Sequence, residues 1–155
     1  MHELLFLFAG SRMPMVMVIG NRSVFAPHGM LCDQTDSMSQ RDTGWLQLYV
    51  ETVQELFDTI LQGYRIAENP KVKLPIMVCQ DGYLLTHSLE RVTLPTQEEV
   101  DAFLPPYQPS ITDHLVPGGL SIFTSFGMMD NWFAEFKYQQ RVAEAHTPHV
   151  IEEVD

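Results

Sequence analysis

Two continuous apolar runs stand out along the chain. Residues 15–19 (Met-Val-Met-Val-Ile) follow Pro14, and residues 76–79 (Ile-Met-Val-Cys) follow Pro75. Neither run alternates polar with apolar side chains, which predicts strands covered on both faces, as in a parallel sheet. The prolines stand where strands begin, at positions that need no donor for the hydrogen-bond ladder.

A helix is predicted between these strands. Residues 52–55 (Thr-Val-Gln-Glu) have the capping-box form, in which a threonine hydroxyl and a glutamate carboxylate bind exposed backbone N–H groups. Apolar side chains then recur at helical spacing until Asn69-Pro70 predicts the end of the helix; they are Val53, Leu56, Phe57, Ile60, Leu61 and Tyr64. Strand, loop, helix and strand follow in the order of a right-handed βαβ crossover, so we expect an α/β fold.

The remaining segments predict a domain that is only partly present. Residues 1–10 contain Glu3 and no cleavage site, which favours a packed helix over a signal peptide or a membrane span. A short strand is predicted at 83–86 and a last helix at about 129–145. We therefore expect part of an α/β domain at 1–104 that lacks its N-terminal portion, an extended Pro/Gly-rich arm at 105–128, and a helix at 129–155 leading toward an absent next domain. Two or three strands are fewer than a free-standing parallel sheet normally has.

Charge and cysteine content argue against several classes of function. The chain has 20 acidic and 9 basic residues and a formal net charge of −11, which argues against a surface that follows nucleic-acid phosphates. Cys32 and Cys79 form no CxxC pattern, so we expect neither a disulfide framework nor an iron–sulfur cluster held by this chain. A buried free thiol is the simplest interpretation of each cysteine, and the reduced cytoplasm is the expected compartment.

The densest polar segment follows the first apolar run, where open α/β sheets place their ligands. Arg22 suits bidentate binding of a carboxylate, although an arginine paired with a nearby aspartate is the common alternative. Asp36 and Arg41 are spaced to form an ion pair that shapes this loop. Asp33 and Asp36 could hold Mg²⁺, but two carboxylates alone are a weak indication.

The order of these motifs resembles the alpha subunit of pyruvate and related 2-oxoacid:ferredoxin oxidoreductases. The match runs through residues 1–6 and 15–22, and residues 33–45 resemble the family's Asp-His-Ser-Asp…Arg-Asp-Thr-Gly-Trp sequence. It continues through residues 46–49, 74–78, 81–83 and 97–107 and so covers essentially the whole chain. The fold that the resemblance implies is the pyrimidine-binding domain of a thiamine-diphosphate enzyme.

The resemblance also implies a reaction shared among chains. In this family thiamine diphosphate attacks a 2-oxoacid, CO₂ leaves, electrons pass through iron–sulfur clusters to ferredoxin or flavodoxin, and coenzyme A takes the acyl group. The alpha chain holds the aminopyrimidine, a partner subunit holds the diphosphate and Mg²⁺, and the clusters lie on other subunits. Arg22 matches the arginine that binds the substrate carboxylate. The implied active-site loop contributes Asp33, Asp36, Gln40, Arg41 and Asp42, and no metal ligand is expected.

Two departures from the family pattern leave alternatives open. Gln34-Thr35 replaces the expected His-Ser, and the glutamate that activates the pyrimidine is absent from this sequence. We therefore expect the isolated chain to bind no cofactor productively. A truncated paralogue that serves only in assembly is the main alternative, and a free-standing flavodoxin-like domain is a weaker one, since no Gly-rich phosphate loop follows the first strand.

Overall fold

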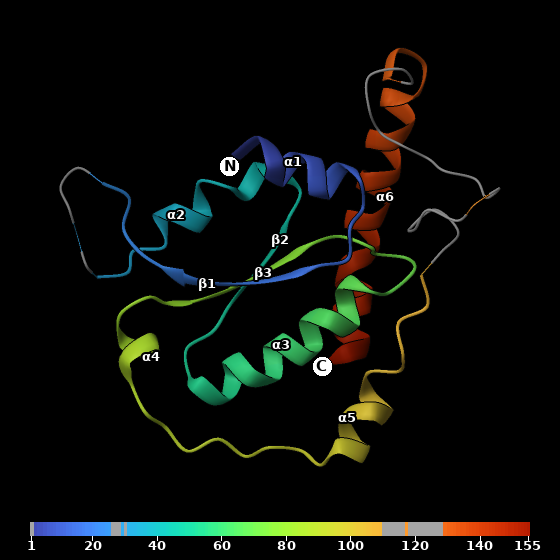
Figure 1. Cartoon of the computed structure of the whole chain (residues 1–155). Helices are drawn as coiled ribbons and strands as arrows, with labels where there is room; N and C mark the ends of the chain where they lie inside the picture. The colour runs from blue at the N-terminus through green and yellow to red at the C-terminus, as the bar shows by residue number, and fades with distance from the viewer. Residues whose placement is uncertain (1, 26–28, 30, 110–116, 118–128) are drawn as a thin grey trace.

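A computed structural model describes residues 2–25, 29, 31–109, 117 and 129–155. A parallel sheet of three strands, in the order β1-β3-β2, forms its centre (Figure 1). The strands are β1 (Val16–Asn21), β2 (Leu46–Tyr49) and β3 (Ile76–Asp81). The helices are α1 (His2–Gly10), α2 (Thr35–Met38), η1 (Arg41–Thr43), α3 (Val53–Ala67), α4 (Leu84–His87), α5 (Gln97–Phe103) and α6 (Met129–Val154). The α/β fold expected from the sequence is confirmed.

Strand β3 is buried on both faces, as its continuous apolar run predicts. Ile76 and Val78 pack into a core that α3 and α6 close, whereas Met77 and Cys79 face a second core built with α1 and Trp45. Successive side chains of a strand point to opposite faces, so a strand between two layers of helices must be apolar at every position. Helices α1 and α3 cover these two faces (Figure 1).

Strand β1 departs from its prediction because it lies at an edge of the sheet. It pairs with β3 alone among the described strands, and Val18 in its middle is 45% exposed. An apolar run shows that a strand is hydrophobic but not whether a neighbour covers it. Burial on both faces was therefore predicted correctly for β3 and wrongly for β1.

Helix α3 begins with half of the predicted capping box. The Thr52 hydroxyl accepts the Glu55 N–H at 3.1 Å, but the Glu55 carboxylate accepts the N–H of Glu51 rather than that of Thr52. The helix ends at Ala67, just before Asn69-Pro70, as predicted. A complete capping box occurs instead at Thr96 and Glu99, where it starts α5.

The strand predicted at residues 83–86 is wrong, because this segment forms α4. One Asp81 carboxylate oxygen accepts the N–H groups of Tyr83 and Leu84, at 2.7 and 2.5 Å, and this side-chain cap favours a helical turn over an extended chain. The last helix extends past Pro148 to Val154, nine residues beyond the predicted Ala145, because Val150 packs into the core beside α3. Residues 105–109 form neither helix nor strand, and the rest of the predicted arm, apart from Pro117, lies outside the described residues.

Candidate functional site

The last residue of β1 organises the carboxyl end of the sheet. Asn21 is fully buried, and its Nδ2 donates to Asp36 Oδ1 at 2.8 Å and to Ser37 Oγ at 2.6 Å. The amide orientation follows from Asp36, since only the NH₂ group can face a carboxylate oxygen favourably. These bonds attach α2 to the end of β1.

A second set of hydrogen bonds attaches α2 to β2. The Ser37 hydroxyl lies 3.0 Å from the Tyr49 hydroxyl, which donates to Gln47 Oε1 at 3.1 Å. Gln47 Nε2 donates in turn to the Ser37 carbonyl at 2.7 Å. Ser37 is buried, so the network satisfies polar groups that would otherwise destabilise the fold.

The turn from β3 into α4 closes the same end of the sheet. Gly82 N donates to the Asn21 carbonyl at 2.9 Å, and a Cβ at Gly82 would lie only 2.2 Å from that oxygen. Glycine is therefore required here for a close backbone approach. The ends of all three strands are thus joined through Asn21, Ser37 and Gly82.

Arg22 lies directly beyond this network. Its backbone N–H donates to Asp36 Oδ2 at 2.9 Å, while its side chain is exposed. Within the described part of the chain, no hydrogen bond or ion pair involves its guanidinium. The structure thus fixes the backbone of Arg22, and its guanidinium lies exposed without a partner among the described residues.

The two carboxylates of the loop have structural partners. Asp33 Oδ1 accepts the Thr35 hydroxyl at 2.7 Å and the Thr35 N–H at 3.0 Å, and these two bonds hold the pKa of Asp33 below its ordinary value. The turn places Gln34 in the left-handed region, with φ 61°. The expected Asp36–Arg41 ion pair is wrong, because the Asp36 oxygens accept from Asn21 and Arg22 and Arg41 approaches Asp42 instead, at 3.8 Å.

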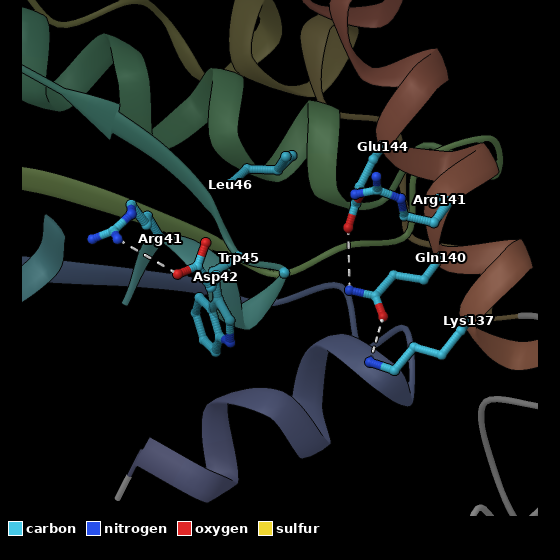
Figure 2. A pocket seen from close by; sticks show the side chains of 9 residues that line it. Arg41, Asp42, Trp45, Leu46, Lys137, Gln140, Arg141 and Glu144 are labelled. Carbon is cyan, nitrogen blue, oxygen red and sulfur yellow. Dashed lines mark hydrogen bonds and ion pairs between the residues drawn. The ribbon is translucent and has the colours of Figure 1, made fainter. Parts of the chain in front are cut away.

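Arg41 and Asp42 lie apart from Arg22, on a shallow pocket of about 330 Å³ between η1 and α6 (Figure 2). Lys137, Gln140, Arg141 and Glu144 of α6 line its other side. Gln40, the remaining predicted site residue, is half-buried and hydrogen-bonds to His2 of α1. The structure therefore brings Arg22, Asp33 and Asp36 together and places Gln40, Arg41 and Asp42 elsewhere.

The residues after Arg41 and Asp42 have a clear structural role. Thr43 is buried and its hydroxyl donates to the Gln40 carbonyl at 2.6 Å, while Trp45 Nε1 donates to the Leu5 carbonyl at 2.9 Å. The backbone of Gly44 has φ +86°, a conformation that residues with a side chain rarely adopt. Trp45 thus anchors the Arg-Asp-Thr-Gly-Trp motif to α1, while Thr43 closes the turn within the loop.

Sequence reasoning missed Asn21, Ser37 and Tyr49 as members of this site. A polar residue that directly follows a buried apolar run is the signal that could have indicated Asn21, because it ends the strand at the edge where ligands bind. The contribution of Ser37 and Tyr49 depends on how α2 and β2 meet, which no local pattern encodes.

Burial also changes the pKa of two side chains at this end of the sheet. Burial raises the pKa of the Cys79 thiol and of the Tyr49 hydroxyl above their ordinary values. Burial thus favours the protonated form of both groups. In the described segments, no group of three or more His, Cys, Asp or Glu side chains could hold a metal ion. Nor does any described helix combine the length and apolarity needed to cross a membrane.

Comparison with protein families gives a match over the whole chain. Residues 1–155 match the family described as "Pyruvate flavodoxin/ferredoxin oxidoreductase, thiamine diP-bdg", the thiamine diphosphate-binding domain of these enzymes. This match agrees with the resemblance inferred from the loop and with the parallel sheet flanked by helices.

Curated relatives agree with the family match. The chain is 42% identical over 153 residues to the pyruvate synthase subunit PorA of Methanothermobacter thermautotrophicus, covering 98% of this chain and 39% of that protein. It is 48% identical over 138 residues to PorA of Methanosarcina barkeri, covering 89% of this chain and 34% of that protein. The ketoisovalerate oxidoreductase subunit VorA of Pyrococcus horikoshii is 40% identical over 148 residues, covering 94% of this chain and 36% of VorA. The chain thus spans between 34% and 39% of the length of these relatives.

Proposed function

This chain belongs to the family of thiamine diphosphate-binding domains of pyruvate flavodoxin/ferredoxin oxidoreductases, and we therefore propose that it forms part of the alpha subunit of a 2-oxoacid:ferredoxin oxidoreductase. The reaction would be oxidative decarboxylation of a 2-oxoacid to acyl-CoA and CO₂, with electrons passing to ferredoxin or flavodoxin. The names of the relatives, pyruvate synthase and ketoisovalerate oxidoreductase, support pyruvate or a branched-chain 2-oxoacid as the substrate class.

The described residues do not fit the metal and diphosphate end of the cofactor. They contain no cluster that could hold Mg²⁺, and the polar groups at the sheet end are largely bonded to one another. Asn21 Oδ1 is buried and has no hydrogen-bond partner among the described residues. We therefore propose that a partner subunit holds the diphosphate and Mg²⁺.

The exposed guanidinium of Arg22 is the observation that carries the proposal. It lies at the carboxyl end of a parallel strand, where this fold class places ligands, on a backbone that Asp36 fixes. A guanidinium presents donors in a planar fork that matches a carboxylate, and it keeps its charge at any physiological pH. Arg22 would thus bind and orient the substrate carboxylate, while Asp33 and Asp36 shape the loop that carries it.

The other parts of the proposed enzyme lie on other chains or segments. Further subunits would carry the iron–sulfur clusters, and ferredoxin or flavodoxin would accept the electrons. The relatives are themselves named as subunits, which supports a multi-subunit enzyme. We propose a cytoplasmic location and a domain of the pyrimidine-binding type at residues 1–104.

The test is an Arg22→Ala substitution in the assembled enzyme that carries this chain, made by coexpression with the partner subunits. Loss of a charged hydrogen bond to the substrate costs about 1.5–3 kcal/mol, so kcat/KM should fall about tenfold to a hundredfold, mainly through KM. The assay is 2-oxoacid-dependent reduction of a viologen dye.

Arg65→Ala is the matched control, because Arg65 is exposed on α3, away from the carboxyl end of β1. It removes the same charge and should leave kcat/KM within about twofold. An Arg22→Ala enzyme with the kinetics of this control would contradict the proposal. A stable complex that lacks activity even with Arg22 intact would favour the assembly-only alternative.

A further inference from the structure

We propose that Asp36 is a positioning residue for substrate binding, which fixes the backbone at Arg22 and so the point from which the guanidinium reaches the substrate. This inference rests on the proposed function, because it assumes that Arg22 binds the substrate carboxylate. Its basis is the set of hydrogen bonds that the Asp36 side chain accepts. Among the described residues, this carboxylate belongs to no group of side chains that could bind a metal ion, and it forms no ion pair with a basic side chain.

Both oxygens of Asp36 are occupied by N–H donors. Oδ1 accepts from Asn21 Nδ2 and from the Ser37 N–H, each at 2.8 Å, and Oδ2 accepts the Arg22 N–H at 2.9 Å. The first two donors fix the carboxylate against buried Asn21 and the first turn of α2. The third donor, the Arg22 N–H, is held by this fixed carboxylate.

Arg22 needs this bond because the sheet does not hold it. The β1–β3 ladder ends at the pair Asn21 and Asp81, one residue before Arg22. Beyond it, Val24 N donates to the Thr35 hydroxyl at 2.9 Å. The N–H groups of two alternate residues, 22 and 24, thus bind side-chain oxygens at the start of α2, in place of the carbonyls of a neighbouring strand.

The Thr35 hydroxyl is itself oriented by Asp33, to which it donates at 2.7 Å. Both loop carboxylates therefore act on the backbone around Arg22, Asp36 directly and Asp33 through Thr35. Bidentate recognition depends on geometry, and a displacement of about 1 Å at a binding group can cost two orders of magnitude in rate. Because the Arg22 side chain has no other restraint among the described residues, its backbone anchor sets the region that the guanidinium can reach.

Asp36→Asn is the informative substitution, since it removes one acceptor and keeps the shape. Two donors face Oδ1 and one faces Oδ2, so the amide oxygen should take the Oδ1 position and the NH₂ group should face the Arg22 N–H. We expect KM for the 2-oxoacid to rise about threefold to tenfold in the assembled enzyme, with kcat per assembled enzyme within about twofold. A purely structural role would instead lower the amount of assembled enzyme at unchanged KM.

Asp58→Asn is the matched control, because Asp58 is exposed on α3 and, among the described residues, accepts hydrogen bonds from Gln54 alone. It should leave KM unchanged. If Asp36→Asn prevents assembly, the same KM is measured for Asp36→Glu, which keeps the charge and moves the carboxylate by one methylene. We expect a smaller rise for Asp36→Glu, and an unchanged KM in that variant would also overturn the inference.

A double-mutant cycle with Arg22→Ala separates this inference from the proposed function. If Asp36 acts through Arg22, Asp36→Asn should change KM less than twofold in the Arg22→Ala background. Full additivity, or an unchanged KM in Asp36→Asn alone, would overturn the positioning role and leave the function of Arg22 standing. An Arg22→Ala enzyme with normal KM would overturn the proposed function and the inference together.

Discussion

At the residue scale, the chemistry of this chain depends on which side chains contact one another at the carboxyl end of the sheet. The sequence pattern drew attention to Arg22, Asp33 and Asp36, and these three residues do lie together. It also predicted an Asp36–Arg41 pair, which the structure replaces with bonds from Asn21 and Arg22. Residue type and spacing identified the right loop, but the partner of each carboxylate depends on α2 packing against β1.

The two cysteines give a direct test of burial at the residue scale. Cys79 is 1% exposed and burial raises its pKa from the ordinary value of 9.0, whereas Cys32 is partly exposed. Since the thiolate is the reactive form, we expect one thiol per folded chain to react with a disulfide reagent near pH 8, and both to react after denaturation. Replacing Cys32 with serine should abolish the fast reaction. Equal labelling rates for the two thiols would show that the β3 core is open.

At the element scale, the predictions succeeded where periodicity and capping agreed with packing. Helix α3 and strand β3 follow their patterns because each is apolar on the faces that the fold buries. The sequence pattern does not reveal strand β2, because Leu46–Tyr49 is short. Its leucine side chains pack in a core that includes residues of α6, which lies far along the chain. The helix at α4 was mistaken for a strand, since only the Asp81 side chain reveals which conformation its backbone takes.

Gly44 tests the anchoring of the loop element. An added Cβ would lie 2.1 Å from Gln140 Nε2 and 3.0 Å from the Ala9 Cβ, at a φ of +86°. We expect Gly44→Ala to lower the free energy of unfolding by about 1–3 kcal/mol, mostly through backbone strain. Denaturant unfolding followed by circular dichroism measures this loss.

Gly10→Ala is the control for that substitution, because nothing lies within 4 Å of a Cβ at Gly10 and the residue belongs to helix α1. It should be neutral or stabilising by up to about 1 kcal/mol. Equal stability of the two variants would mean that the turn at Gly44 tolerates a side chain and does not fix the loop.

At the scale of the whole molecule, several large aromatic side chains of one helix lie exposed on the described surface. The amino-terminal half of α6 projects beyond the sheet (Figure 1), and Trp132, Phe133 and Tyr138 on it are between 52% and 65% exposed. Exposed aromatic side chains of this kind are typical of surfaces that another chain covers. No sequence pattern could show this, since the same periodicity predicts a packed helix face.

We therefore expect the isolated chain to self-associate. Self-association makes the sedimentation coefficient rise with protein concentration in analytical ultracentrifugation. The double substitution Trp132→Ser and Phe133→Ser should reduce this rise. The control is Leu89→Ser with Leu94→Ser, two apolar residues that are 102% and 67% exposed on the segment between α4 and α5. A monomeric wild-type chain, or an equal effect of the control pair, would contradict the role of α6.

The strand order also dictates when this sheet can form during synthesis. Strand β3 lies between β1 and β2, and each of these pairs with β3 rather than with the other. Among the described strands, β1 and β2 therefore have no hydrogen-bonding partner on the ribosome until residues 76–81 have left the exit tunnel. Until then the apolar strand β1 has its hydrogen-bonding edge toward β3 exposed, a period in which chaperone binding would protect the nascent chain from aggregation.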